Sequence, residues 1–252
     1  MDRSYLSDPE VVAASRKFIC VRLASYEDAG EVDFLQSVFT MRGVLQNTVF
    51  CILAPDGKKK LVNAGRAPGW AFGVAEDMAL EMNEIAVDYK PGKTRPVDLG
   101  LPYLKSVRLA MNVAACDSQR LAIVYAPDLE TRAALEAKLV ELAWSKEIIG
   151  RFLFAMTKDV SDLAKVDGAS GEPGILVVVP GAYGVQGKQL VHVPVRADAK
   201  TLRAALREAA ESDAGGAKDS QRHIRRARQK GIRWRTATPV TDNSGRQRRR
   251  RR

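Results

Sequence analysis

The chain is poor in the residue types that most catalytic and metal sites use. Its 252 residues include two histidines and three cysteines, and aromatic residues make up 6% of the total. His192 and His223 lie far from each other and from every cysteine, so the sequence predicts no His/Cys metal site. Their spacing also offers no Ser-His-Asp or Cys-His arrangement. We therefore expect no metal, no cofactor and no catalytic triad.

Phosphate-binding glycine motifs and long apolar runs are missing as well. Neither GxxxxGK[ST] nor GxGxxG occurs, and the glycines of GAYGVQG (181–187) join two expected strands, as in a hairpin loop. No apolar run approaches the ~20 residues of a membrane span. The N-terminal sequence MDRSYLSDPEVV is acidic and polar, unlike a secretory signal, which indicates a cytoplasmic protein if Met1 is the true start.

The three cysteines form no CxxC pair, and an odd number makes a poor disulfide framework. Cys20 and Cys51 lie inside the apolar runs FICVRL and TVFCIL, so we expect buried thiols that pack as small hydrophobic side chains. Cys116, just before an expected strand, is the candidate reactive thiol. However, no cationic group or helix N-terminus in its vicinity is evident to lower its pKa.

Positive charge gathers at the C-terminal end. The net charge is +10, and residues 218–252 carry 14 Lys and Arg against two Asp, whereas the rest carries 26 basic and 28 acidic residues. Because a block of like charge repels itself, we expect a disordered tail over 213–252. Arginine clusters bind phosphates by counterion release, and a tryptophan among them can stack on a base. The candidate polyanion-binding residues are Arg225, Arg226, Arg228, Arg233, Trp234 and Arg235. The alternative is a solvated tail with no specific role.

Apolar periodicity predicts an α/β protein in two parts. Residues 1–89 have the order helix, strand, helix, strand, strand, helix, and residues 119–212 have the order strand, helix, strand, short helix, strand, strand, helix. Residues 90–118 begin with the Pro- and Gly-rich KPGKTRPVDLGLP, which is typical of a linker. The expected strands are 18–24, 48–54, 59–65, 120–126, 151–157, 174–180 and 188–195; the main expected helices are 30–39, 70–89, 129–147 and 198–211.

The order of elements in residues 119–212 resembles that of the thioredoxin-like fold. In that family a mixed four-stranded sheet forms from a β-α-β half and a β-β-α half, and a cis-proline precedes the third core strand. Pro173 stands at that place, before GILVVVP, so the resemblance implies a cis bond there. A proline is harmless at the first residue of a strand because its missing N–H is not needed.

Residues 1–89 resemble the same family only in part. SDPEVVAASRKFICVRLAS is similar to the stretch that follows the redox helix, and APDGKKKLVNAGR is similar to the family's hairpin. The first strand and the helix that opens with CxxC have no counterpart, and Asn47–Thr48 replaces the family's proline. Either another segment fills that place or the natural chain begins upstream.

The resemblance does not bring the family's chemistry with it. The redox position falls in YAPDLETRA, which contains no Cys or Ser, and Asp128 and Glu130 are suited to cap a helix. We therefore expect a non-catalytic scaffold or interaction module with an unidentified protein partner. The alternative function is polyanion or nucleic-acid binding through the basic tail.

Overall fold

The computed structural model describes residues 4–46, 48–90, 100–145, 147–212 and 219–233. They divide into two compact units, with the boundary between residues 97 and 98. Each unit is considered separately below. In the described ranges no helix combines the length and the apolar character that a membrane crossing requires.

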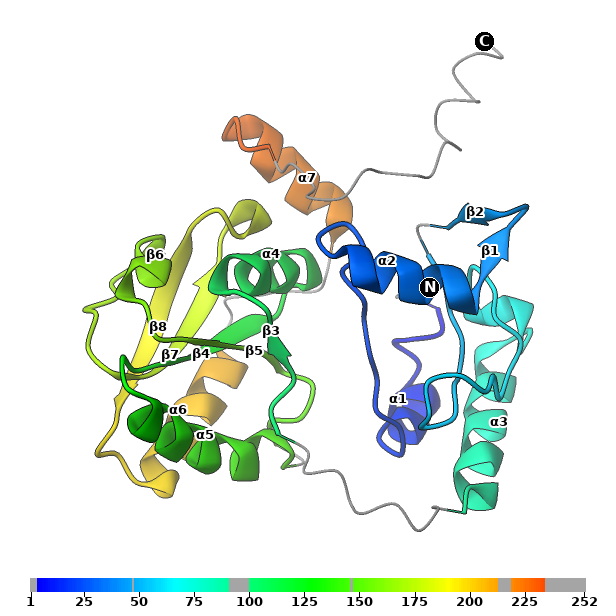
Figure 1. The fold of residues 1–252 in the computed structure, drawn as a ribbon, viewed down its shortest axis with the longest axis horizontal. Helices are drawn as coiled ribbons and strands as arrows, with labels where there is room; N and C mark the ends of the chain where they lie inside the picture. The colour runs from blue at the N-terminus through cyan, green and yellow to red at the C-terminus, as the bar shows by residue number, and fades with distance from the viewer. Residues whose placement is uncertain (1–3, 47, 91–99, 146, 213–218, 234–252) are drawn as a thin grey trace. The chain divides into compact units, whose positions relative to one another are not determined.

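A six-stranded mixed sheet forms the centre of the second unit (Figure 1), in the order β3-β5-β4-β7-β8-β6. β5 runs parallel to β3 and β4, β7 is antiparallel to β4 and β8, and β6 is parallel to β8. The strands span Tyr103–Leu104 (β3), Arg120–Tyr125 (β4), Phe152–Thr157 (β5), Val166–Asp167 (β6), Gly174–Pro180 (β7) and Gly187–Pro194 (β8).

Helices α5 (Leu129–Ala143) and α6 (Ala199–Glu211) cover one face of this sheet (Figure 1). Side chains alternate between the faces of a strand, so Ala122 and Val124 of β4 meet these helices. Leu135 and Leu139 of α5 lie one turn apart and are almost completely buried against the strands. The apolar stripe of the sequence thus becomes one half of the core.

Helix α4 (Val107–Asp117) and the 3₁₀ turn η2 (Val160–Leu163) pack on the opposite face. The other set of β4 side chains, Leu121 and Ile123, faces them. Ser106 caps α4 by accepting a hydrogen bond from the N–H of Leu109 at 3.1 Å. The sheet is therefore covered on both sides, which agrees with the completely buried apolar run from Leu121 to Val124 in β4.

Most predictions for residues 119–212 are confirmed. The predicted helices and strands follow one another in the expected order, and Asp128 and Asp198 cap α5 and α6 as N-cap acceptors. The short strand β6, which was not predicted, lies between η2 and β7, and the sheet has six strands where four were expected. The prediction of one linker over 90–118 is wrong for its second part, because β3 and α4 occupy 103–117. The helix α4 is buried on most of its circumference, so it lacks the amphipathic stripe that identifies a surface helix.

The cis-proline prediction is also wrong. No cis peptide bond occurs among the described residues, so the bond before Pro173 is trans. Pro173 directly precedes β7, whose first residue Gly174 pairs with Tyr125. A trans proline fits there because ladder pairing begins only at the next residue.

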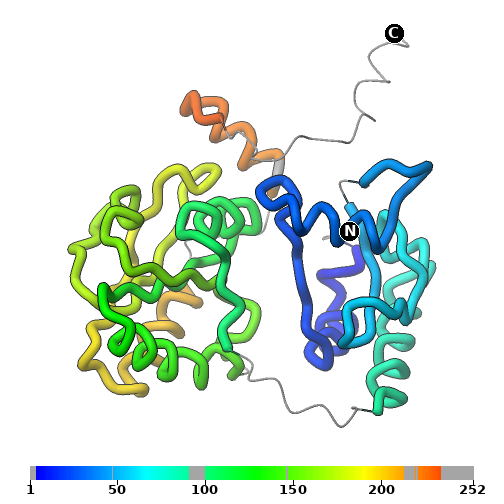
Figure 2. Tube along the Cα trace, in the orientation of Figure 1, coloured from blue at the N-terminus to red at the C-terminus, as the bar shows by residue number. Residues whose placement is uncertain are grey.

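In residues 4–46 and 48–90 the first unit has three helices and two pairs of antiparallel segments. The helices are α1 (Pro9–Ser15), α2 (Ala29–Val38) and α3 (Ala75–Asp88), with a 3₁₀ turn η1 (Pro68–Trp70) before α3; one hairpin joins β1 (Thr40–Met41) and β2 (Val44–Leu45). The strands predicted at 48–54 and 59–65 do not form; the two segments meet only in isolated antiparallel bridges, between Phe50 and Gly65 and between Leu53 and Lys60. The trace of this unit is followed most easily in Figure 2.

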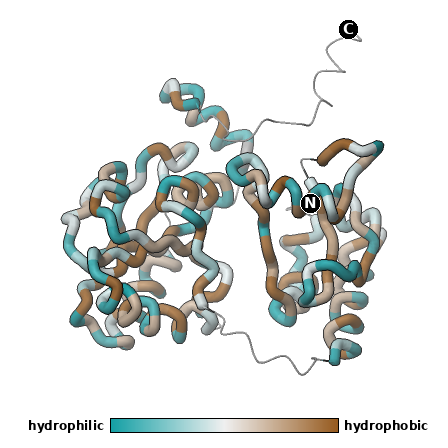
Figure 3. The backbone as a smooth tube through the Cα atoms, viewed as in Figure 1, coloured by the Kyte–Doolittle hydropathy of each residue, from teal (hydrophilic) through white to brown (hydrophobic). Residues whose placement is uncertain are grey.

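The strand expected at 18–24 does not form. These residues pair with no strand in the described part of the chain, and the apolar stretch after α1 is visible in Figure 3. Ile19 and Val21 are 74% and 72% exposed. Cys20 is exposed too, which corrects the prediction of a buried thiol. β-branched residues favour a strand only where a neighbouring strand supplies hydrogen bonds and packing.

We expect Leu139→Ala to lower the free energy of unfolding by about 2 to 5 kcal/mol, because it leaves a cavity between α5 and the sheet. Leu139 is fully buried, whereas Leu129 of the same helix is 73% exposed. The matched control Leu129→Ala should change the stability little. Urea denaturation of both variants measures the difference, and equal losses would contradict this assignment of the core.

Candidate functional site

The loop between β4 and α5 lies where the predicted redox position falls. Asp128 is the N-cap of α5, and its Oδ1 accepts a hydrogen bond from the N–H of Thr131 at 2.7 Å. This hydrogen bond lowers the pKa of Asp128. The guanidinium of Arg132 donates to the carbonyl oxygens of Ala126 and Pro127 at 2.7 and 2.9 Å. The loop is thus closed by a carboxylate and a guanidinium and carries no nucleophile.

Pro173 lies near this loop because β7 begins beside the end of β4. Nε2 of His192, on β8, lies 3.2 Å from the carbonyl oxygen of Glu172. Space beside the strand start is tight, since a Cβ on Gly174 would lie 2.4 Å from the carbonyl oxygen of Val193 and 2.5 Å from Nε2 of His192. The histidine therefore contacts the main chain at Pro173, and Gly174 permits that contact.

Carboxylates at the end of β5 are engaged in local hydrogen bonds. The hydroxyl of buried Thr157 donates to Asp162 at 2.5 Å and accepts from the N–H of Asp159 at 3.1 Å. Asp159 caps η2 by accepting from the N–H of Ser161 at 2.8 Å, which lowers the pKa of Asp159. Among the described residues no group of three or more His, Cys, Asp or Glu side chains could hold a metal ion. These carboxylates serve local structure.

The candidate reactive thiol Cys116 lies in the last turn of α4 and is half-buried. Its position at the C-terminal end of a helix is unfavourable for a thiolate, because the helix dipole is negative there. Cys51 is half-buried, where a buried thiol was predicted, and its Sγ lies 3.5 Å from the carbonyl oxygen of Val62. Burial raises the pKa of the Cys51 thiol. Neither environment favours a nucleophilic thiolate.

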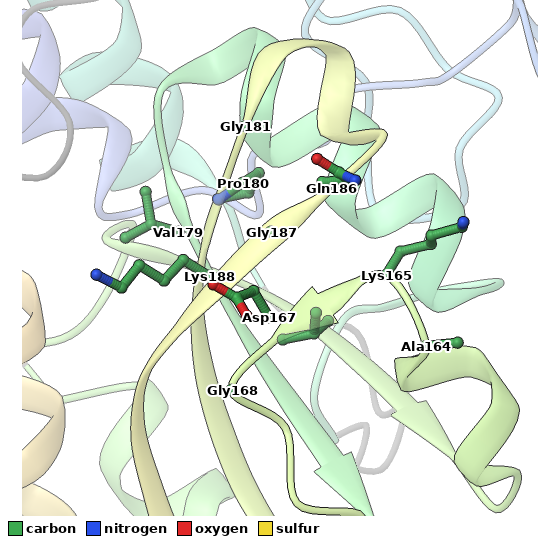
Figure 4. A pocket seen from close by; sticks show the side chains of 11 residues that line it. Ala164, Lys165, Asp167, Gly168, Val179, Pro180, Gly181, Gln186, Gly187 and Lys188 are labelled. Carbon is green, nitrogen blue, oxygen red and sulfur yellow. The ribbon is translucent and has the colours of Figure 1, made fainter.

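An open hollow lies between β6 and the turn that joins β7 to β8 (Figure 4). Glycines and short main-chain stretches line much of it, and its charged side chains are Lys165, Asp167 and Lys188. The two lysines point away from each other and out of the hollow. Charges of one sign therefore do not converge there.

The basic residues of the expected tail gather on a helix. Helix α7 spans Ser220–Gln229, with Asp219 as its N-cap, so the prediction of disorder over 213–252 is wrong for this part. Residues 219–233 carry six exposed cations, and none pairs with a carboxylate among the described residues. They are Arg222, Arg225, Arg226, Arg228, Lys230 and Arg233. Trp234 and Arg235 lie outside the described residues.

The other face of α7 packs against the turn η3 (Ala182–Gly184). Ala227 is completely buried, and His223 and Ile224 are half-buried. Nε2 of His223 accepts a hydrogen bond from the N–H of Tyr183 at 3.2 Å. Their rings meet edge to face, with centroids 4.7 Å apart. These contacts hold α7 against η3 despite the repulsion among its positive charges.

The turn η3 is held from behind by α4. Asn112, only 1% exposed, donates from Nδ2 to the carbonyl oxygen of Tyr183 at 3.0 Å. Gly184 has a φ of +64° and approaches so closely that a Cβ would lie 2.2 Å from the carbonyl carbon of Met111. Only glycine fits this approach. The segment GAYGVQG is therefore the support on which α7 packs, as well as a hairpin loop.

Sequence reasoning found the arginines of this site but missed His223, Tyr183 and Asn112. The available signal was the spacing of His223, Ile224 and Ala227, which lie on one side of a helix. No family model, curated protein or solved structure matches the chain. The candidate functions therefore depend on the geometry described above.

We expect Asn112→Leu to destabilise the second unit by about 1 to 3 kcal/mol, because it deprives the buried carbonyl of Tyr183 of a donor. Gln229→Leu, which replaces an exposed amide on α7, is the control and should cost much less. Thermal and urea unfolding measure both. If the two variants are equally stable, the amide of Asn112 does not hold η3.

Proposed function

We propose that the second unit is a thioredoxin-like domain that acts as a non-catalytic interaction module. The arrangement of its core strands carries this proposal. β4, α5 and β5 form a parallel β-α-β half, while β7, β8 and α6 form an antiparallel β-β-α half. The two halves join through the antiparallel pair β4 and β7, and helices lie on both faces. The thioredoxin-like fold, which residues 119–212 resemble in sequence, is built from the same two halves.

The differences between the second unit and the thioredoxin-like fold support a non-catalytic role. Thiol-disulfide exchange needs a thiolate at a helix N-terminus and a second thiol within reach. The N-terminus of α5 presents Asp128 and Thr131 instead. The trans bond before Pro173 is a further departure from the family pattern. Interaction with another protein is the function that remains for such a domain once its redox pair is missing.

Insulin reduction with dithiothreitol as the electron donor tests the absence of redox chemistry. The wild-type chain should reduce insulin no faster than a Cys20→Ser, Cys51→Ser, Cys116→Ser variant, because none of the three thiols lies at a helix N-terminus. A clear excess for the wild type would overturn the non-catalytic assignment.

The redox pair can be supplied to test the likeness to thioredoxin. Asp128→Cys and Thr131→Cys, made together in the cysteine-free background, place two thiols at the N-terminus of α5. The two positions are close, because Oδ1 of Asp128 lies 2.7 Å from the backbone nitrogen of Thr131. We expect a disulfide within the domain and a lowered pKa of the first thiol, because the helix dipole favours the thiolate. The single Asp128→Cys variant is the control. Absence of the disulfide after oxidation would contradict the proposal.

A second function, polyanion binding, is favoured by the unpaired cations of α7. Arginine on a helix of fixed shape contacts phosphate oxygens without first having to order a flexible chain. Helix α7 exposes no large apolar side chain, because Ile224 is half-buried and Ala227 is completely buried. This composition favours the phosphates of a nucleic acid over insertion into a lipid surface.

We expect Arg225→Gln, Arg226→Gln and Arg228→Gln together to weaken binding to duplex DNA and to reduce its salt dependence. The slope of log K against log salt should fall by about 0.9 for each arginine that contacts a phosphate. A control with Lys58→Gln, Lys59→Gln and Lys60→Gln removes three exposed cations from the first unit and should change the slope less. Fluorescence polarisation measures both slopes, and equal changes would argue against α7 as the binding site.

A further inference from the structure

His223 is the polar centre of the contact between α7 and η3. Its Nε2 lies 3.2 Å from the backbone nitrogen of Tyr183, whose N–H points at it. Because the N–H donates, Nε2 must carry a lone pair, so the ring is neutral with its proton on Nδ1. A protonated imidazole has a donor at both nitrogens and cannot accept this bond.

The partner of His223 cannot turn away easily. Tyr183 has a left-handed backbone with a φ of +53°, its carbonyl is held by Asn112, and Gly184 lies against the main chain of Met111. These contacts fix the direction of the Tyr183 N–H. Protonation of His223 would therefore place the N–H at Nε2 opposite the N–H of Tyr183, and the loop could not relieve this repulsion by a small rearrangement.

The charges around His223 also oppose its protonation. Arg226 lies one turn further along α7, and partial burial followed by the charge of Arg226 lowers the pKa of His223. Arg222 precedes it on the same helix, and the carboxylate of Asp219 is engaged by the N–H groups of Gln221 and Arg222. The turn η3 presents only the neutral Tyr183. Helix α4 behind it carries Arg108 and Asp117.

We propose that His223 is a pH-sensitive latch that holds α7 on the second unit when neutral and releases the helix when protonated. The docked histidine has the lower pKa, so docking is fully present above the ordinary pKa of about 6.5. It weakens as the pH falls below that value, by up to about ten-fold in the docking equilibrium per pH unit for one proton. The loss levels off once the pH is below the pKa of the docked ring.

Release of α7 would change which of its side chains are exposed to solvent. In the docked state only the polar and cationic side of α7 is exposed, whereas release also uncovers Ile224 and Ala227. The latch does not depend on polyanion binding, because the arginines that face outward are not part of the contact with η3. Failure of the DNA-binding experiment would leave the latch untouched.

The test is hydrogen exchange of the amides in 220–229, followed on the full chain between pH 7.5 and 5.0 and corrected for the intrinsic exchange rates. In the wild type the corrected rates should rise below about pH 6.5, by up to about ten-fold per pH unit. His223→Gln keeps an acceptor that does not titrate, so its exchange should stay slow across the range. His223→Ala should exchange fast at every pH.

The second histidine provides the matched control. His192→Gln removes the only other imidazole of the chain and should leave the pH dependence as in the wild type. The NMR titration of the His223 ring gives the pKa directly. A flat exchange profile in the wild type, an equally steep profile in His223→Gln, or a His223 pKa at or above the ordinary value would each overturn the latch.

Discussion

The second unit depends on β4, whose side chains have to be removed from water on both faces at once. Leu121, Ala122, Ile123 and Val124 are all completely buried. Backbone groups at such a position can be satisfied only by strands on either side, which β5 and β7 supply. Two layers of helices must then cover the two faces. The architecture follows from the need to bury one short apolar segment completely.

The main helices and strands of residues 119–212 were predictable because several local patterns agree with one another. The alternation in the strands, the stripe of leucines in α5 and the caps Asp128 and Asp198 all indicate the same elements. The first unit was less predictable. A run such as 18–24 has the composition of a strand, but composition does not reveal whether a neighbour is present to pair with it.

Two helices escaped prediction for different reasons. Helix α4 directly follows a Pro- and Gly-rich stretch, 90–102, whose composition led the whole segment 90–118 to be assigned as a linker. Helix α7 is so cationic that composition alone indicates disorder, and only the small face made by His223, Ile224 and Ala227 attaches it to η3. The candidate site was therefore predictable as a list of arginines but not as a surface. Its supporting residues come from α4 and from a loop distant in sequence, which local patterns do not connect.

The order in which the sheet partners appear along the chain has a consequence for synthesis. β4 is made before both of its neighbours, and its antiparallel partner β7 follows only after α5, β5 and η2. A segment that is fully hidden in the finished protein therefore leaves the ribosome with nothing to pair with. Such non-local pairing slows folding and leaves apolar chain open to association in the meantime. The apolar side chains of β4 can be covered only once β5 and β7 have followed, which happens before α7 is made.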